Sequence, residues 1–164
     1  MDSTVGRASR DEWQVIDDLY PSLRRFAAVT APSDMEPDDL LHDALVKLLS
    51  RRSLDDLNHP DAYIRKTILN LAASHYRRMG RRRTALVRLA ASDRAVVESA
   101  YPSDLAELFR LPPKERATLY LAEVEGYKFD EIAKLLDCSA PAARKAASRA
   151  KHRLRLELIT GSRG

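Results

Sequence analysis

Apolar residues recur every three or four positions along most of the chain, which is the spacing of one face of an α-helix. No segment alternates apolar and polar residues with period two, as a half-buried β-strand would. Only five of the 164 residues are glycine, and β-branched residues are sparse. The pattern predicts an all-α protein.

Three helices are predicted in the front of the chain, each with an apolar stripe. Proline opens two of them, because it suits the first helical position. Asp38 and Asp39 follow one of these prolines, where negative charge complements the helix N-terminus. The predicted helices run over about 11–29, from Pro37 onward, and from Pro60 to about Arg78, with Gly80 as a stop.

The rear of the chain is predicted to hold three further helices. They begin near Pro112–Pro113, at Phe129 and at Pro141, and the last of them is long and basic. Between the two groups lies a stretch of arginines and small residues, with a short helix expected around Leu86–Leu89. The predicted organisation is therefore two small helical domains, 1–80 and 105–164, joined by a flexible linker over 81–104.

The segment Phe129–Ala146 has the spacing of a helix-turn-helix. Ala133 lies where the two helices pack closely and only a small side chain fits. Asp137 occupies the turn position that needs a left-handed backbone, which aspartate tolerates better than most residues. Ser139 offers a hydroxyl to cap the second helix, and Ala143 faces inward.

Charge is divided unevenly along the chain. The net charge of +4 is the sum of about −6 over residues 1–64 and about +10 over residues 65–164. The acidic front and basic rear suggest one protein partner and one polyanion. The candidates for DNA contact on the last helix are Arg144, Lys145, Ser148, Arg149, Lys151 and Arg153. The alternative is a helical hairpin with a solvated basic face.

Several functional classes have little support in the sequence. The chain has one cysteine, Cys138, too few for a disulfide framework or a zinc site, and it has no long apolar run. Its start does not resemble an export signal, so a soluble cytoplasmic protein is expected. The four histidines fall in separate elements, without ligand spacing or a nucleophile motif. No enzyme activity, metal or cofactor is predicted.

Motifs in both domains resemble those of one family. Leu111–Arg116, the helix-turn-helix and Ala147–Arg155 together resemble the promoter-binding C-terminal domain of bacterial RNA polymerase sigma factors. Asp39–Asp43 resembles the family's Asp-Leu-Val-Gln-Glu segment, and Pro60–Ala72 resembles the helix that reads the melted minus-ten element. With two domains and a short linker, the chain is similar to the extracytoplasmic-function class of sigma factors.

The resemblance implies a role for three sets of residues. The minus-ten set is Lys66, Asn70, Arg77 and Arg78, with Arg81–Arg83 as further phosphate contacts. The minus-thirty-five set is Arg144, Lys145, Ser148 and Arg149. The polymerase-binding set is Asp39, His42 and Asp43, with Asp38 beside them and His42 in place of the family's glutamine. An anti-sigma factor is a further expected partner.

The minus-ten set would read single-stranded DNA. In the family, a base of the non-template strand is flipped into a pocket between this helix and the preceding loop, here about Leu57–Ala62. An Asn70-like amide helps to read the base by hydrogen bonding. Few aromatic residues are available for stacking, and Tyr63 and Tyr76 are the nearest. Hydrogen bonding by Asn70 and the loop is therefore the expected source of specificity.

The recognition helix departs from the family pattern at its start. Pro141-Ala142-Ala143 stands where the family usually has Gly-Thr-Val, and alanine supplies no phosphate or base contact. A weak or unusual minus-thirty-five preference is therefore expected. In the family the linker threads the polymerase cleft, but Arg81–Arg83 is equally compatible with a charged tether.

Three functions are compatible with the sequence. The leading one is a transcription initiation factor that binds core polymerase and reads both promoter elements. The second is a helix-turn-helix regulator that binds duplex DNA without polymerase. The third is a protein-interaction module held by an anti-sigma factor.

Overall fold

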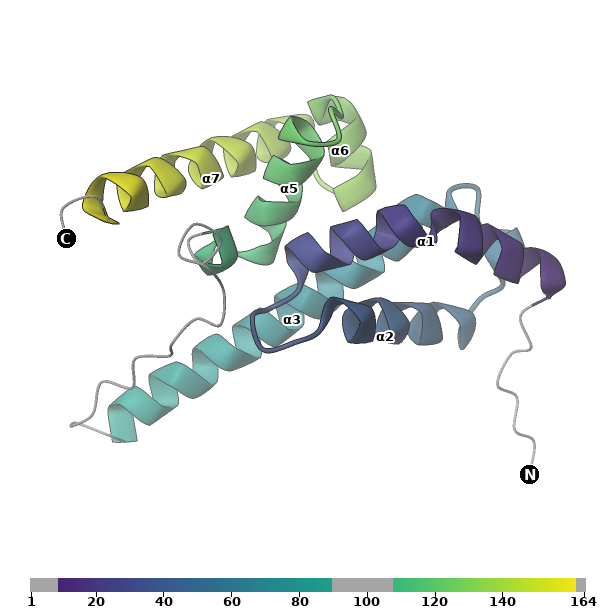
Figure 1. The fold of residues 1–164 in the computed structure, drawn as a ribbon, viewed down its shortest axis with the longest axis horizontal. Helices are drawn as coiled ribbons and strands as arrows, with labels where there is room; N and C mark the ends of the chain where they lie inside the picture. Colours follow the sequence, from purple (N-terminus) through teal and green to yellow (C-terminus); the bar gives the residue numbers. More distant parts are fainter. Residues whose placement is uncertain (1–8, 90–107, 162–164) are drawn as a thin grey trace.

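The computed structural model describes residues 9–89, here called the front half, and residues 108–161, called the rear half. Within these ranges every regular element is a helix, which confirms the predicted all-α class (Figure 1). The elements are α1 (Arg10–Thr30), α2 (Pro37–Leu49), the 3₁₀ turn η1 (Leu54–Asp56), α3 (Pro60–Leu89), α5 (Pro113–Glu123), α6 (Phe129–Leu136) and α7 (Ala140–Gly161).

The front half is a three-helix unit built on apolar stripes. Its buried side chains include Leu23 and Phe26 of α1, Leu40 of α2, and Ile64 and Ile68 of α3. Burying such side chains is worth roughly 1.5–3 kcal/mol each relative to leaving them in water. The three predicted helices are confirmed, and their starts differ from the predicted ones by at most one residue.

A buried carboxylate joins the start of α1 to η1. Glu12 completes a capping box with Ser9, accepting the Ser9 N–H at 2.6 Å, and its second oxygen accepts the Leu54 N–H at 2.8 Å. The Ser53 hydroxyl also donates to Glu12. The Ser53 hydroxyl and the two backbone donors hold the pKa of Glu12 below its ordinary value, against the effect of burial.

Helix α3 is longer than predicted. It continues without a break through Gly80 and Arg81–Arg83 to Leu89, so the expected end near Arg78 and the separate short helix at Leu86–Leu89 are wrong. Gly80 lacks the positive φ of a helix stop. A mid-helix glycine costs only about 1 kcal/mol relative to alanine, and the arginine, alanine and leucine residues that follow favour helix.

The rear half contains the predicted helix-turn-helix. Asp137 has φ 53° and ψ 54°, the left-handed conformation expected of the turn. The Ser139 hydroxyl accepts the Ala142 N–H at 3.2 Å and caps α7, as predicted. Ile132 and Ala143 are fully buried between the helices, and Ala133 is also buried.

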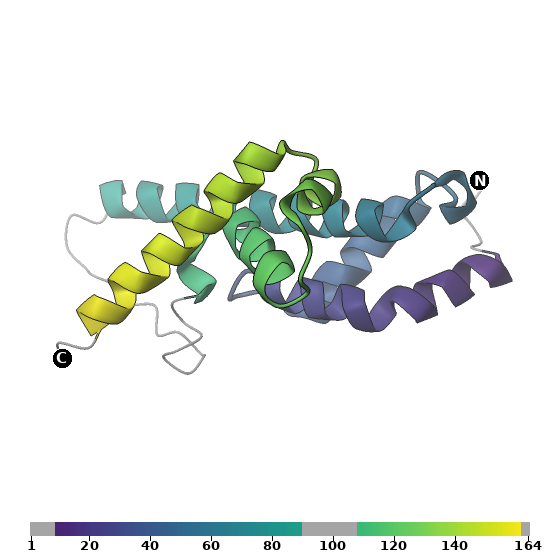
Figure 2. The same ribbon diagram turned by 90° about the horizontal axis from the view of Figure 1, so that it is seen from above.

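The two halves pack directly against each other. Leu121 of α5, Ile132 and Leu135 of α6, and Ala143 of α7 belong to the same buried cluster as the core of the front half. Figures 1 and 2 show α5 and α6 lying over α1 and α3, with α7 on the outer side. The sequence patterns predict the helices of each half but not this contact.

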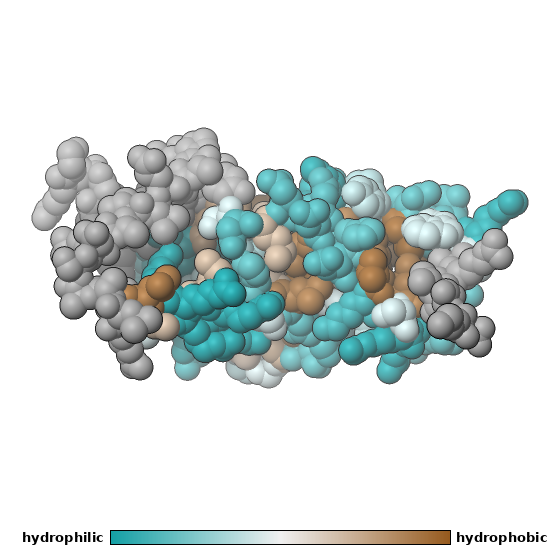
Figure 3. All heavy atoms as spheres, turned by 90° about the horizontal axis from the view of Figure 1, so that it is seen from below, coloured by the Kyte–Doolittle hydropathy of each residue, from teal (hydrophilic) through white to brown (hydrophobic). Residues whose placement is uncertain are grey.

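The opposite face of the molecule is mainly polar. Viewed from below, brown apolar patches are separated by teal polar side chains (Figure 3). Val46 of α2 and Met79 and Leu86 of α3 are among the exposed large apolar residues. No described helix is long and apolar enough to cross a membrane.

Candidate nucleic-acid interface

The outer face of α7 presents the predicted minus-thirty-five residues to solvent. Arg144, Lys145, Ser148 and Arg149 are all exposed. They project from this face because Ala143, Ala146, Ala147 and Ala150 occupy the buried side of the same helix. Small side chains inside and cations outside make α7 a suitable helix for insertion into a DNA groove.

A shallow groove beside α7 adds residues that the sequence analysis did not select. The groove has a volume of about 490 Å³. It is lined by Phe129 of α6 and by five polar or basic residues of α7: Arg144, Ser148, Lys151, His152 and Arg155. The Arg144 guanidinium carbon lies 5.8 Å from the centre of the Phe129 ring, within cation–π range. The spacing of four, four and three residues between 144, 148, 152 and 155 could have indicated this stripe, but the contribution of Phe129 depends on the packing of α6.

Two cations of α7 form ion pairs with carboxylates of α5. Arg153 Nη1 lies 3.3 Å from Glu115 Oε2, and Lys151 pairs with Glu123. Both side chains remain about half exposed, 49% for Lys151 and 50% for Arg153, so their contact with DNA stays a prediction. Both partners lie about 30 residues or more earlier in the chain, so the pattern of α7 alone could not indicate them.

The predicted minus-ten residues lie along α3 but in different surroundings. Asn70, Arg77 and Arg78 are exposed. Lys66 is half-buried, and its Nζ lies 2.7 Å from Asp137 Oδ2 in the helix-turn-helix. This contact lowers the pKa of Asp137 through the hydrogen bond and the charge of Lys66. The structure thus ties Lys66 of this set to the rear half.

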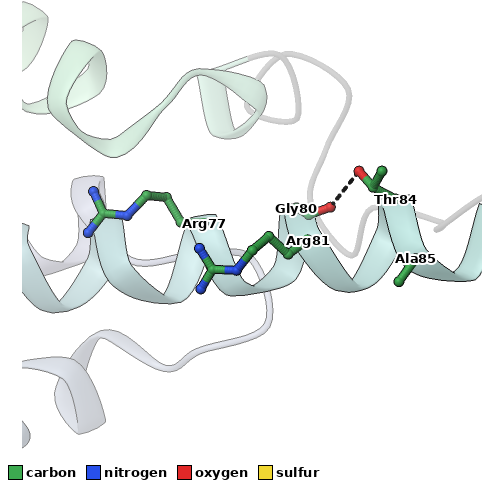
Figure 4. A pocket seen from close by; sticks show the side chains of 5 residues that line it. All are labelled: Arg77, Gly80, Arg81, Thr84 and Ala85. Atoms are coloured by element: carbon green, nitrogen blue, oxygen red, sulfur yellow. Dashed lines mark hydrogen bonds between the residues drawn. The ribbon is translucent and has the colours of Figure 1, made fainter.

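The predicted phosphate contacts continue along α3 to Arg81. Arg77 and Arg81, one turn apart, project toward the same side of the helix, and Gly80 lies between them (Figure 4). A side chain at Gly80 would meet nothing within 4 Å, so the space beside the arginines is open. A phosphate backbone could approach the helix closely there.

The loop before α3 and the two candidate tyrosines complete this surface. Leu57 is partly buried, whereas Asn58 and His59 are exposed. The Arg52 guanidinium carbon lies 5.9 Å from the centre of the half-buried Tyr63 ring, while Tyr76 is 39% exposed. Arg52 could add a cation to any base stacked on Tyr63, and the sequence analysis did not select it.

The polymerase-binding candidates form an exposed acidic face on α2. Asp39, His42 and Asp43 are exposed, with Asp43 one turn after Asp39. Asp38 differs, because its carboxylate binds Arg24 of α1 at 2.8 and 3.1 Å. Arg24 holds the pKa of Asp38 below its ordinary value. Asp38 therefore joins α2 to α1, although all three carboxylates are exposed.

Comparisons with known proteins agree with this arrangement. The family model for sigma-70 region 2 matches residues 15–83, and the model for sigma-70 region 4 matches residues 106–154. The chain is 29% identical over 142 residues to the RNA polymerase sigma-E factor of Streptomyces coelicolor, covering 84% of this chain and 80% of that protein.

The fold is also similar to a solved structure. That structure is the sigma factor RpoE in complex with the anti-sigma factor NepR from Bartonella quintana. The TM-score is 0.66 at 22% identity, over 92% of this chain and 98% of the other. At this level of identity the likeness concerns the fold.

The helices, the helix-turn-helix and the two region matches define a bacterial transcription initiation factor. The chain belongs to the sigma-70 family and is an alternative sigma factor of the extracytoplasmic-function class. As such it binds core RNA polymerase and promoter DNA. The reading of the chain as a stand-alone helix-turn-helix regulator is not favoured.

Proposed function

We propose that α3 reads the minus-ten element and α7 reads the minus-thirty-five element, while α2 binds core polymerase. The observation that carries this proposal is that each matched region has one helix, α3 in the first and α7 in the second, that exposes polar and basic residues. The proposed organisation is a front domain over 1–80, a connecting segment over 81–104 and a rear domain over 105–164. Helix α3 extends nine residues into the connecting segment.

At the minus-ten element, Asn70 would pair with the edge of an extruded base. Its amide is exposed on α3 and carries both a donor and an acceptor. Extruding a base costs a few kcal/mol, which hydrogen bonds and stacking offset. Lys66, Arg77 and Arg78 would hold neighbouring phosphates.

At the minus-thirty-five element, Arg144, Lys145, Ser148 and Arg149 would make the contacts. An arginine can donate two hydrogen bonds to a guanine edge, and the other cations suit phosphates. The exposed Pro141 and Ala142 at the start of α7 offer no polar side-chain atom. This composition supports a modest sequence preference with a large electrostatic component.

At the polymerase, Asp39, His42 and Asp43 would lie against a basic, polar surface. Exposed carboxylates complement such a surface and increase the association rate more than the final affinity. His42 can donate or accept one hydrogen bond there, as the family's glutamine does, but with a different reach.

We further propose an anti-sigma factor as a partner. Support comes from the solved sigma factor of similar fold, which was captured in complex with the anti-sigma factor NepR. The protein would act in the cytoplasm, where its polymerase and promoters are, and would have no catalytic role of its own.

Transcription in vitro tests this proposal directly. Core polymerase plus the protein is expected to start transcription from a subset of a promoter library, while core polymerase alone is not. The variant Asp39→Asn/Asp43→Asn is expected to need more protein for half-maximal transcription, whereas the exposed control Asp55→Asn is not. Failure of the native protein on every template would overturn the proposal.

A further inference from the structure

A single buried carboxylate ties the loop before α3 to the start of α1. Glu12 is 5% exposed, and its Oε1 accepts the Ser53 hydroxyl and, at 2.8 Å, the Leu54 N–H. These donors lie 41 and 42 residues further along the chain. The other oxygen, Oε2, accepts the Ser9 N–H at 2.6 Å and completes the capping box of α1. The carboxylate therefore acts in two places at once.

The capping box does not account for the contacts of Oε1. A capping box needs one acceptor oxygen at its third helical position, which glutamine supplies as glutamate does. Burying an ionised carboxylate costs free energy unless its oxygens accept hydrogen bonds. The Ser53 hydroxyl and the N–H groups of Ser9 and Leu54 lower the pKa of Glu12 despite its burial, so the carboxylate is ionised at neutral pH. Hydrogen bonds to this charge hold the loop more firmly than bonds to a neutral acceptor would.

The two loop residues that this carboxylate holds also organise the turn η1. The Ser53 hydroxyl accepts the Asp55 N–H at 3.3 Å and caps the turn. The carbonyl oxygens of Ser53 and Leu54 accept two further N–H groups, those of Asp56 and Leu57, at 3.3 and 3.0 Å. The side chain of Leu54 is also buried in the core. The path of the chain through 53–57 therefore depends on these two residues.

The loop continues directly into the surface proposed to read the minus-ten element. Asn58 and His59 follow the turn and are exposed, and the His59 carbonyl accepts the Tyr63 N–H at 3.2 Å at the start of α3. The Asn58 amide and the His59 ring offer donors and acceptors to a base edge. The exposed Arg52, just before the turn, lies over the Tyr63 ring at 5.9 Å. Polar, cationic and aromatic groups thus flank the anchored turn.

The loop and Asn70 lie at different places along α3. Pro60 and Asn70 are separated by ten helical positions, which is about 15 Å at 1.5 Å per residue. Successive nucleotides of a stacked strand are about 3.4 Å apart. The loop would therefore face a different nucleotide of the minus-ten element from the one that Asn70 faces.

We propose that Glu12 is a positioning residue for promoter reading: its contacts with the turn η1 fix the loop so that Asn58 and His59 meet one base of the minus-ten element. The inference rests on the proposed function of α3, and it adds a residue of α1 that lies outside the surface assigned to DNA. Glu12 acts through the loop, without touching DNA itself. A loop that is held in place before binding loses less conformational freedom when it closes on a base.

Hydrogen exchange of the free protein, measured by mass spectrometry, tests the anchor itself. Glu12→Ala removes the acceptors of the loop, and exchange over 53–59 is expected to become about tenfold faster, since hydrogen bonds to a charged group are lost. Ser9→Ala is the matched control, because it removes the other side chain of the capping box and leaves the contacts of Oε1 in place. This control is expected to leave exchange over 53–59 unchanged.

Transcription by the holoenzyme from templates randomised at the minus-ten element tests the reading role. Glu12→Ala is expected to lower discrimination at one position by about fivefold, the lower end for loss of a base contact. This position is expected to differ from the one affected by Asn70→Ala, and minus-thirty-five discrimination is expected to stay native. Glu12→Gln keeps one acceptor oxygen, so its loss of discrimination is expected to be smaller.

Ser53→Ala tests the same contact from the side of the loop. It removes the hydroxyl that donates to Glu12 and caps η1. We expect it to lower discrimination at the same position as Glu12→Ala. Because both substitutions act on one contact, their effects in the double variant are expected not to add. If Glu12→Ala does not fold, Ser53→Ala and Glu12→Gln decide the question.

The outcomes separate this proposal from the proposed function. Unchanged exchange over 53–59 in both Glu12→Ala and Ser53→Ala would overturn the anchor. Faster exchange with native discrimination at every minus-ten position would overturn the positioning role. Equal losses at all positions, or the same loss in Ser9→Ala, would also overturn it, because a general loss of folded protein would then explain the effect. Failure of the native protein on every template would instead count against the proposed function, and the exchange result would still decide whether Glu12 holds the loop.

Discussion

The side chain of Arg116 donates to the backbone oxygen of Thr30 across the interface of the two halves, at 3.1 Å. Both residues are buried, so the guanidinium relies on protein oxygens in place of water. This relationship joins α5 of the rear half to the end of α1.

Replacing Arg116 by glutamine is expected to lower the free energy of unfolding by about 2–4 kcal/mol. The shorter side chain cannot reach both carbonyls, and hydrogen bonds to a charged group contribute roughly 1.5–3 kcal/mol each. Urea denaturation followed by circular dichroism measures the change. Exposed Arg149→Gln, on the outer face of α7, is the comparison; an equal effect of the two substitutions would contradict a stabilising role for the Arg116 contact.

The Glu12 carboxylate predicts a pH dependence of stability. Its pKa in the folded protein is lowered, chiefly by the Ser53 hydroxyl and then by two backbone donors. The stabilisation is therefore present above the unfolded-state pKa, near 4.5, and is lost as the pH falls through the lower folded-state pKa. Glu12→Gln is expected to lower stability at pH 7 by about 1–3 kcal/mol and to flatten the acid limb of the curve.

Exposed Asp11 is the matched control for Glu12. It lies beside Glu12 in the first turn of α1 but on the solvent side. Asp11→Asn is expected to leave the acid limb nearly unchanged. If the acid limb of the stability curve is flattened in Asp11→Asn but unchanged in Glu12→Gln, Glu12 is not the source of the pH dependence.

Charge removal on α7 should change the salt dependence of promoter binding. If Arg144 and Arg149 contact phosphates, each alanine substitution lowers the slope of log affinity against log salt by about 1. If Arg144 instead reads a base, Arg144→Ala leaves the slope of log affinity against log salt unchanged, and discrimination at that base falls by about 1–3 kcal/mol. Titrations of the holoenzyme at several salt concentrations distinguish these outcomes. The exposed Lys134→Ala, on α6, should change neither quantity.

The amide of Asn70 is expected to set the preference for one minus-ten base. Asn70→Ala should reduce discrimination at that position by about 1–3 kcal/mol. Because Asn70 is exposed, the substitution should have little effect on the thermal unfolding of the protein. Transcription from templates randomised at the minus-ten element measures the preference. Equal discrimination by native and variant proteins would remove Asn70 from the reading of the base.

Much of the fold follows from local signals in the sequence. The apolar stripes place α1, α2 and α3, and the aspartate at position 137 adopts the left-handed turn that its position predicts. The Ser139 cap is likewise a local interaction, over three residues. Such features are predictable because residues close in the sequence determine them.

The contacts between distant segments could not be predicted in this way. The Lys66 and Asp137 side chains are 71 residues apart, and Lys151 pairs with a carboxylate on another helix. No periodicity indicates which surface charges meet after packing. The continuation of α3 past Gly80 was missed for a different reason, since the weak helix preference of glycine was outweighed by the residues around it.

The most direct test of the assignment places a DNA-cleaving probe on each half. A probe attached at Ser74→Cys reports from α3, and one at Ala142→Cys reports from the start of α7, each in a Cys138→Ala background. In the holoenzyme bound to a promoter that it transcribes, cleavage is predicted near the minus-ten element from α3 and near the minus-thirty-five element from α7. Cleavage at the same element from both probes, or at the reverse positions, would contradict the account.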